Sequence, residues 1–256
     1  MPLTYAQRIS QDAVLFRQFR DGESEDADVQ QHLRALRTLK FNAAYPLLFS
    51  ANRALNEEEN NKLLKALVSL VVRHNVVCGL DRAKIESNVY ATAKLLAEGA
   101  SYNAALNSLI SISPTDVQFD SSFETLAFGK SEHSIARYLL SSIDAKMGAT
   151  QEVTVAGSDR VHVEHIYPQT PLPDNRWPLH DQNVRLFGNL TLLDKRLNET
   201  IKNANFETKK QSAYTGSRLE ITKALLVLPS WTPEAVAMRQ AQLRDLAKQI
   251  WPSGLV

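Results

Sequence analysis

The stretch that decides the fold reads Val161-His162-Val163-Glu164-His165-Ile166-Tyr167-Pro168. Its β-branched residues, ended by a proline, predict a strand over 161–167. Glu164 and His165 place a hard metal ligand and a base side by side at the end of that strand. Adjacent residues of a regular strand point to opposite faces. A twisted strand end relaxes this rule, so we expect Glu164 to reach a metal near His165.

A second stretch completes the pattern. It reads Gly188-Asn189-Leu190-Thr191-Leu192-Leu193-Asp194-Lys195-Arg196-Leu197-Asn198. We expect 184–193 to be extended and broken by a turn at Gly188-Asn189, with a helix from Asp194 onward. The second asparagine follows the first by nine positions. Two extended segments and a helix, in this order, are what a ββα-metal (HNH-type) nuclease site needs.

Each residue of this pattern has a chemical role to fill. Phosphodiester hydrolysis needs an activated water, which a neutral imidazole can provide, so we assign His165 as the general base. One divalent cation can stabilise the phosphate and the leaving 3′ oxygen. Glu164 and Asn198 offer it hard oxygen ligands, which suit Mg²⁺ or Mn²⁺, and Asn203 competes with Asn198 for this role. Asn189 is expected to hydrogen-bond the backbone of the His-bearing loop and so fix the base.

Charge is concentrated around the pattern. The whole chain carries +1, whereas 185–218 has seven Lys and Arg against three acids, a net charge of +4. A DNA backbone favours such an excess. The candidate phosphate ligands are Lys195, Arg196, Lys202, Lys209 and Lys210.

The other histidines are not assigned a catalytic role. His162 is interpreted as structural, and His180, in the proline-rich loop 168–183, is a lesser candidate to approach the site. Those on predicted helices are interpreted as incidental: His32, His74 and His133.

Helices are predicted on both sides of the strands. They cover 28–41, a segment from an Asn56 cap to about 74, a segment from an Asp81 cap to about 98, then 131–147, 217–228 and 233–250, the last capped by Thr232. The polar stretch 148–160 predicts a boundary between a helical domain, 1–150, and a nuclease domain, 151–256. The expected fold class is α+β, mostly α-helical, with a ββα-metal domain flanked by C-terminal helices.

Composition excludes several classes of protein. No apolar run approaches the roughly 20 residues of a membrane span, and the first residues lack a signal-peptide pattern. The single cysteine, Cys78, excludes an internal disulfide and a cysteine-based zinc site. We therefore expect a soluble cytoplasmic protein.

At the quoted residues the chain resembles the C-terminal HNH-type nuclease domain of GmrSD-type, modification-dependent restriction endonucleases. Related phosphorothioate-sensing nicking nucleases carry the same pattern. The resemblance covers about 161–251 and includes Gln169, Phe206, Lys209, Trp231 and Arg239 beside the two stretches, and it continues more loosely over 71–80 and 136–140. Asn198 stands where many members have His.

The resemblance implies a metal-dependent endonuclease that nicks double-stranded DNA, modified or not, in restriction or anti-phage defence. Such proteins begin with a nucleotide-binding domain, which nothing here resembles. We therefore expect this chain to be a C-terminal part whose helical half links to that domain. Two alternatives stay open: an inactive HNH scaffold serving as a DNA-binding or interaction module, and an RNA-directed nuclease. The oligomeric state is left open.

Overall fold

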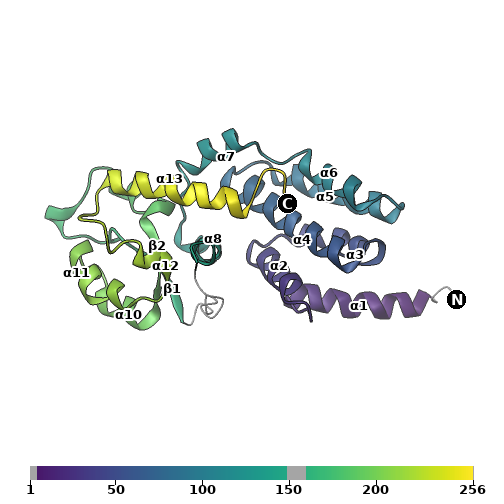
Figure 1. The fold of residues 1–256 in the computed structure, drawn as a ribbon, viewed down its shortest axis with the longest axis horizontal. Coiled ribbons are helices and arrows are strands. Elements are labelled where there is room, and N and C mark those ends of the chain that lie inside the picture. Colours follow the sequence, from purple (N-terminus) through teal and green to yellow (C-terminus); the bar gives the residue numbers. More distant parts are fainter. Residues whose placement is uncertain (1–4, 149–159, 256) are drawn as a thin grey trace. The chain divides into compact units, whose positions relative to one another are not determined.

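The computed structural model describes residues 5–148 and 160–255 (Figure 1), and the chain divides into two compact units. The first unit comprises Met1–Phe119 and Trp251–Val256, and the second comprises Asp120–Ile250. No described helix combines the length and the apolar composition that a bilayer span requires.

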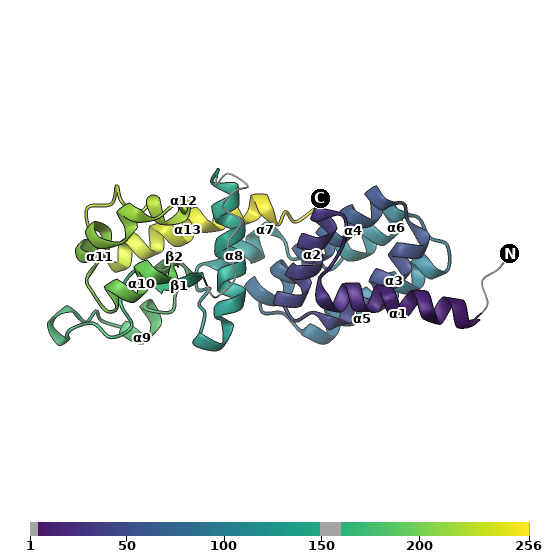
Figure 2. The same cartoon turned by 90° about the horizontal axis from the view of Figure 1, so that it is seen from below.

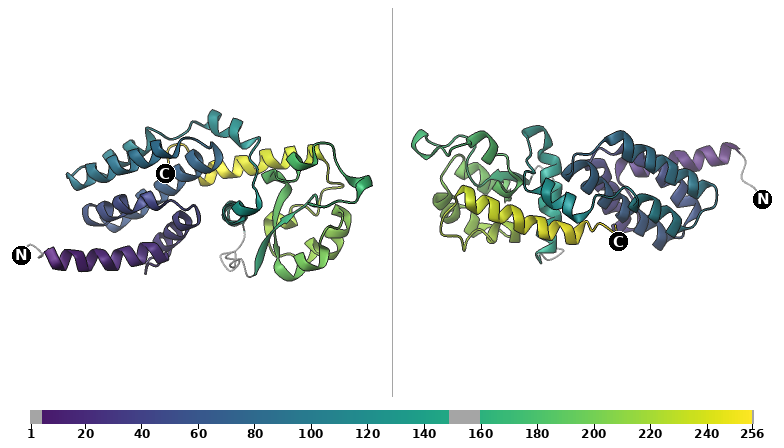
Figure 3. Two further views of the ribbon diagram at one scale, coloured as in Figure 1. Left: turned by 180° about the vertical axis from the view of Figure 1, so that it is seen from behind. Right: turned by 90° about the horizontal axis from the view of Figure 1, so that it is seen from above.

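The first unit consists of helices, drawn from purple to teal in Figures 1 and 3. They are α1 (Tyr5–Asp21), α2 (Ala27–Thr38), α3 (Tyr45–Ala54), α4 (Glu57–Val71), α5 (Arg82–Ala97) and α6 (Tyr102–Ile110), with a 3-10 turn at Asn42–Ala44 and a π-helix at Val72–Val77. Helix α7 (Asp116–Phe123) crosses the division between the units. Apolar side chains at helical spacing, such as Leu63, Leu67 and Leu70 of α4, are buried.

Two predicted helix starts in this unit are confirmed. Asn56 accepts a hydrogen bond from Glu59 N, and the Glu59 carboxylate accepts one from Asn56 N, which forms a capping box before α4. The Asp81 carboxylate accepts from Ala83 N at the start of α5. These short polar side chains satisfy backbone N–H groups that a helix start leaves unpaired, which is why the sequence marks them clearly.

The second unit contains the only two strands of the described residues. Its elements are a 3-10 turn (Lys130–Glu132), α8 (His133–Lys146), β1 (Val161–His165), a 3-10 turn (Pro173–Asn175), α9 (His180–Asn183), a 3-10 turn (Phe187–Asn189), β2 (Leu190–Asp194), α10 (Lys195–Ile201), α11 (Phe206–Ser212), a 3-10 turn (Tyr214–Gly216), α12 (Glu220–Lys223) and α13 (Pro233–Ile250). The strands pair antiparallel, from Val161 opposite Asp194 to His165 opposite Leu190. Helices α8 and α10 both pack against this pair (Figure 2).

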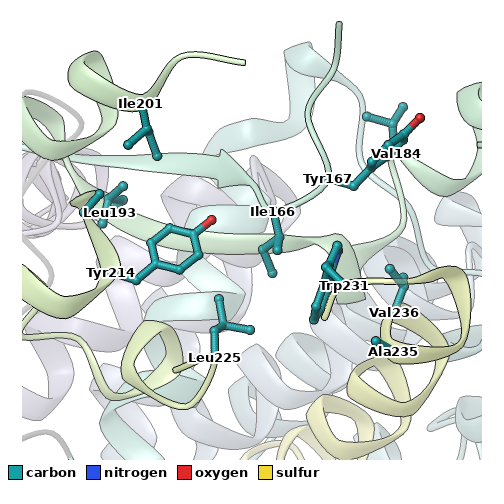
Figure 4. Close-up of a cluster of buried hydrophobic side chains, with 11 residues drawn as sticks. Ile166, Tyr167, Val184, Leu193, Ile201, Tyr214, Leu225, Trp231, Ala235 and Val236 are labelled. Atoms are coloured by element: carbon teal, nitrogen blue, oxygen red, sulfur yellow. The ribbon is translucent and has the colours of Figure 1, made fainter. Parts of the chain in front are cut away.

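An apolar cluster holds the strands to the C-terminal helices (Figure 4). Ile166 and Leu193 come from the strand region, Tyr214 follows α11, and Trp231 precedes α13. Each is nearly or fully buried. Burial of such side chains contributes about 1.5–3 kcal/mol apiece, so this cluster stabilises the region that carries Glu164, His165 and Asn189. The predicted cap of α13 is also present, because Thr232 Oγ1 accepts from Ala235 N.

Several predicted boundaries are wrong. The first strand ends at His165, and only Leu190–Asp194 of the second segment is a strand, because Phe187–Asn189 forms a 3-10 turn. The segment 217–228 contains only the short α12, and two short helices interrupt the long loop. Most of the predicted linker, 149–159, lies outside the described residues. The two compact units divide at 119, and α8 packs against α13 and both strands. The division into a helical domain, 1–150, and a nuclease domain, 151–256, stays a prediction.

Candidate active site

His165 ends β1 and is buried, with 7% of its surface exposed. The side-chain amide of Gln169 lies 3.3 Å from its Nε2 atom. Burial, together with the smaller electrostatic effects of His133 and Lys209, lowers the pKa of His165 to about 4. The imidazole is therefore neutral at neutral pH and can accept a proton.

Glu164, one residue earlier, is engaged in a buried ion pair. Lys209 of α11 donates through Nζ to Glu164 Oε1 at 2.5 Å and to the backbone oxygen of His165 at 2.6 Å. Lys209 is fully buried and Glu164 is 6% exposed. Burial raises the pKa of Glu164 and lowers that of Lys209, whereas their mutual attraction opposes both shifts. The ammonium group of Lys209 thus stabilises the charged form of the Glu164 carboxylate, which burial alone would disfavour.

The two residues contact different helices. The Glu164 carboxylate meets Lys209 on α11, whereas the ring of His165 lies beside His133 on α8. This is the alternation of a regular strand, carried through to its last residue. The two side chains thus have different neighbours, and the approach of Glu164 to a metal near His165 stays a prediction.

Asn189 fixes the backbone that follows His165. Its Oδ1 accepts from Tyr167 N at 2.8 Å and from Trp231 Nε1 at 2.9 Å, and its Nδ2 donates to Tyr167 O at 3.1 Å and Val184 O at 3.0 Å. The backbone oxygen of Asn189 also accepts from Ile166 N at 2.9 Å. The predicted hydrogen bonds to the His-bearing loop are therefore present, and Asn189 is completely buried.

Gly188 is required by a close approach of α13. A Cβ atom there would lie 2.5 Å from the backbone oxygen of Val236 and 2.8 Å from Gln240 Oε1, so any larger residue would push the helix away. Gln240 accepts from Gly188 N, and Arg239 donates to Gly188 O at 2.7 Å and Leu190 O at 2.6 Å. The Gly188-Asn189 turn is thus held on both sides by buried side chains.

The two asparagines predicted as helix ligands lie on and just after α10. Asn198 is half-buried on that helix, which packs against β1 and β2, and Asn203 is exposed beyond its end. Lys202 ends α10 with a positive φ of 43°. Placement on a helix packed against the Glu164-bearing strand favours Asn198 over Asn203.

The five predicted phosphate ligands fall into two groups. Lys195, Arg196 and Lys202 are exposed at the two ends of α10. Lys209 is buried with Glu164, and Lys210 is half-buried and donates to Leu228 O at 2.8 Å. The prediction that Lys209 meets DNA is wrong for this conformation, because its ammonium group has no access to solvent.

Two residues near the site were missed. His133, interpreted as incidental, places its ring centroid 5.7 Å from that of His165. Tyr214 is buried, and the Glu164 charge adds to burial in raising its pKa well above the usual value. Neither carries a local sequence signal, since a helical His and a core Tyr are common. His180 does lie close by, bonded to Tyr167 Oη at 2.9 Å and to Gln169 O at 3.1 Å.

Most of the second unit matches a known protein family. The sequence pattern of a family described as GmrSD restriction endonucleases, C-terminal domain, matches residues 113–246. The chain belongs to this family. No curated protein matches the chain. The match spans α8, both strands, α10 and most of α13, so every residue placed above lies within the GmrSD C-terminal region, and that family consists of nucleases.

The donor chemistry of this GmrSD-type site fits a hard divalent cation. The described residues contain no group of three or more His, Cys, Asp or Glu that could hold a metal. Mg²⁺ does not need such a group, because it binds through one or two carboxylates, waters and substrate phosphates. Glu164 has a carboxylate, which is paired with Lys209 in this conformation, and Asn198 has an amide oxygen on α10, which packs against β1.

Replacing Asn189 with alanine should lower the free energy of unfolding by about 3 kcal/mol or more, because four buried hydrogen-bonding groups lose their partner. Urea denaturation measures this change. The exposed Asn203→Ala variant is the matched control and should stay within about 0.5 kcal/mol of the wild type. Equal stability of the two variants would show that the Asn189 amide does not hold the turn.

Replacing Lys209 with methionine should destabilise the fold by about 3–5 kcal/mol, because it leaves the Glu164 carboxylate buried without a counter-charge. Adding Glu164→Gln should recover most of the loss. Lys202→Met, at an exposed position, serves as control. A double variant no more stable than Lys209→Met alone would contradict the pairing.

Proposed function

We propose that this chain is a metal-dependent DNA endonuclease in which His165 is the general base. The observation that carries the proposal is the buried, neutral imidazole of His165 at the end of β1, followed at once by a backbone segment that Asn189 holds rigidly. Membership of a restriction-endonuclease family supports the same reaction class.

His165 would accept a proton from the attacking water. A low pKa keeps the imidazole free of a proton at neutral pH, and its burial excludes bulk water that would compete for it. Water loses a proton to His165 and attacks phosphorus, and the bond to the 3′ oxygen breaks. The leaving oxygen takes a proton from solvent, so the products are a 5′-phosphate and a 3′-hydroxyl. Asn189 is the positioning residue, because it bonds to both backbone groups of Tyr167, two residues beyond the base.

Glu164 and Asn198 are the proposed ligands of one Mg²⁺ or Mn²⁺ ion, with Asn203 as the alternative to Asn198. When bound, this ion supplies charge stabilisation for the phosphate and the leaving oxygen. The contact of Lys209 with Glu164 keeps the carboxylate ordered and close to the strand end.

DNA would be held by the exposed basic residues of α10. Lys195 and Arg196 begin the helix and Lys202 follows its last residue, and all three are exposed, so they are the proposed phosphate contacts. Lys209 and Lys210 are left out of this surface, because their ammonium groups bond to protein oxygens.

The biological setting is part of the proposal. A single site of this kind cuts one strand at a time, so we propose nicking of double-stranded DNA within a bacterial restriction or anti-phage system. A nucleotide-binding domain is the proposed partner of the helical unit.

A supercoiled-plasmid assay with Mg²⁺, Mn²⁺ or EDTA tests the reaction. Wild type should convert the plasmid to open circle only with metal, and His165→Ala should lower the rate by at least about 100-fold while it keeps its fold by circular dichroism. Asn198→Ala should raise the metal concentration needed, whereas Asn203→Ala should not. Metal-dependent nicking that survives in His165→Ala would overturn the base assignment. Cleavage of RNA but not DNA would replace the substrate, and a folded protein that binds DNA without cleaving it would favour an inactive scaffold.

The pH dependence of kcat/KM should reflect the low pKa of His165. The neutral form is the active one, so lowering the folded-state pKa from its usual 6.5 to about 4 extends activity toward acid. We expect activity at about pH 5.5 to remain within about twofold of its value at pH 7.5, since a base of unshifted pKa would be only about one-tenth neutral there. Tryptophan fluorescence at each pH checks that the protein stays folded. An acid limb near pH 6.5 would contradict the burial of the base.

A further inference from the structure

His133 lies where a second imidazole can meet the substrate of His165. It opens α8, a helix of 14 residues that packs against β1. The ring centroids of His133 and His165 are 5.7 Å apart and the ring planes are tilted by 47°. The two imidazole rings are therefore neighbours at the end of β1.

The Nε2 atom of His133 has no role within the fold as described. It is buried, and no described residue hydrogen-bonds to it. Buried polar atoms almost always have partners, so an unpaired nitrogen beside a candidate base calls for a ligand. Burial and the nearby charge of Lys130 both lower the pKa of His133. The ring is therefore neutral at neutral pH and carries one N–H donor.

The two imidazoles are complementary in what they offer. His165 serves as an acceptor, since a base must take a proton. His133 has a buried nitrogen that can donate, and Lys130, an exposed residue three positions earlier, is close enough for its charge to lower the pKa of His133. A buried donor near a cation favours an anionic oxygen, and a phosphodiester supplies two of them.

We propose that His133 contacts the substrate directly, through a hydrogen bond from Nε2 to a non-bridging oxygen of the phosphodiester that His165 acts on. This inference rests on the proposed nuclease function. It makes α8, which precedes the strand pair in the chain, part of the substrate-binding surface, and it gives His133 a role in orienting the phosphate toward the activated water.

Two substitutions separate this role from simple packing. His133→Phe keeps a planar ring and loses the donor, whereas His133→Asn keeps a donor and loses the ring. Substrate contact predicts that Phe weakens binding of a short DNA duplex, measured by fluorescence anisotropy in Ca²⁺, and lowers kcat/KM by roughly 10- to 100-fold. Asn should stay within about fivefold of wild type. A packing role predicts the reverse order, with Asn the worse variant and a lower Tm.

Matched controls make the outcome specific. His162→Phe alters a half-buried histidine on the same strand as His165 and should change neither binding nor cleavage. Lys195→Ala should reduce the slope of log Kd against log salt by about 1, because it releases fewer counterions, whereas His133→Phe should leave the slope unchanged, because a neutral imidazole releases none.

The results distinguish failure of this inference from failure of the proposed function. One outcome would overturn only the role of His133. In it, wild type nicks DNA, His165→Ala does not, and His133→Phe binds and cleaves DNA as wild type does. If wild type binds DNA without cutting it, the anisotropy constants of the two His133 variants still decide the contact. If wild type neither binds nor cuts DNA, both proposals are overturned.

Discussion

The side-chain amide of Asn189 is the interaction on which the candidate site depends. Its four hydrogen bonds join the segment after His165, the turn before β2 and the indole of Trp231. These groups are far apart in the sequence. A side-chain amide suits them because its NH2 group can donate to two carbonyl oxygens while its oxygen accepts from two N–H groups. The close approach of α13 to Gly188 completes the same junction. The position of His165 is therefore set by the turn before β2 and by α13 as well as by β1.

The side chains of Glu164 and His165, at the end of β1, point to opposite faces of the strand. Glu164 faces α11 and shares its charge with Lys209, and His165 faces α8 and lies beside His133. The Lys209 ammonium group also bonds to the backbone of His165, so it ties the two faces together. Burial affects the two side chains differently. It raises the pKa of Glu164, which the charge of Lys209 opposes, and it lowers the pKa of His165, which keeps the imidazole neutral.

Sequence reasoning succeeded where the cause is local. The caps at Asn56, Asp81 and Thr232 follow from side chains that bond to N–H groups two or three residues away. It failed where the cause is tertiary. Lys209 sits in a basic, polar stretch that is typical of a solvated helix face, and only the position of Glu164 explains its burial. His133 gives no signal until α8 is packed on β1.

The most direct test of the account is the anomalous diffraction of Mn²⁺ in crystals of the His165→Ala variant bound to a short DNA duplex. The account predicts a peak bound by Glu164 and Asn198, with a backbone phosphate between that ion and the imidazole of His133. A Mn²⁺ peak elsewhere in the second unit, or DNA bound away from the end of β1, would contradict it.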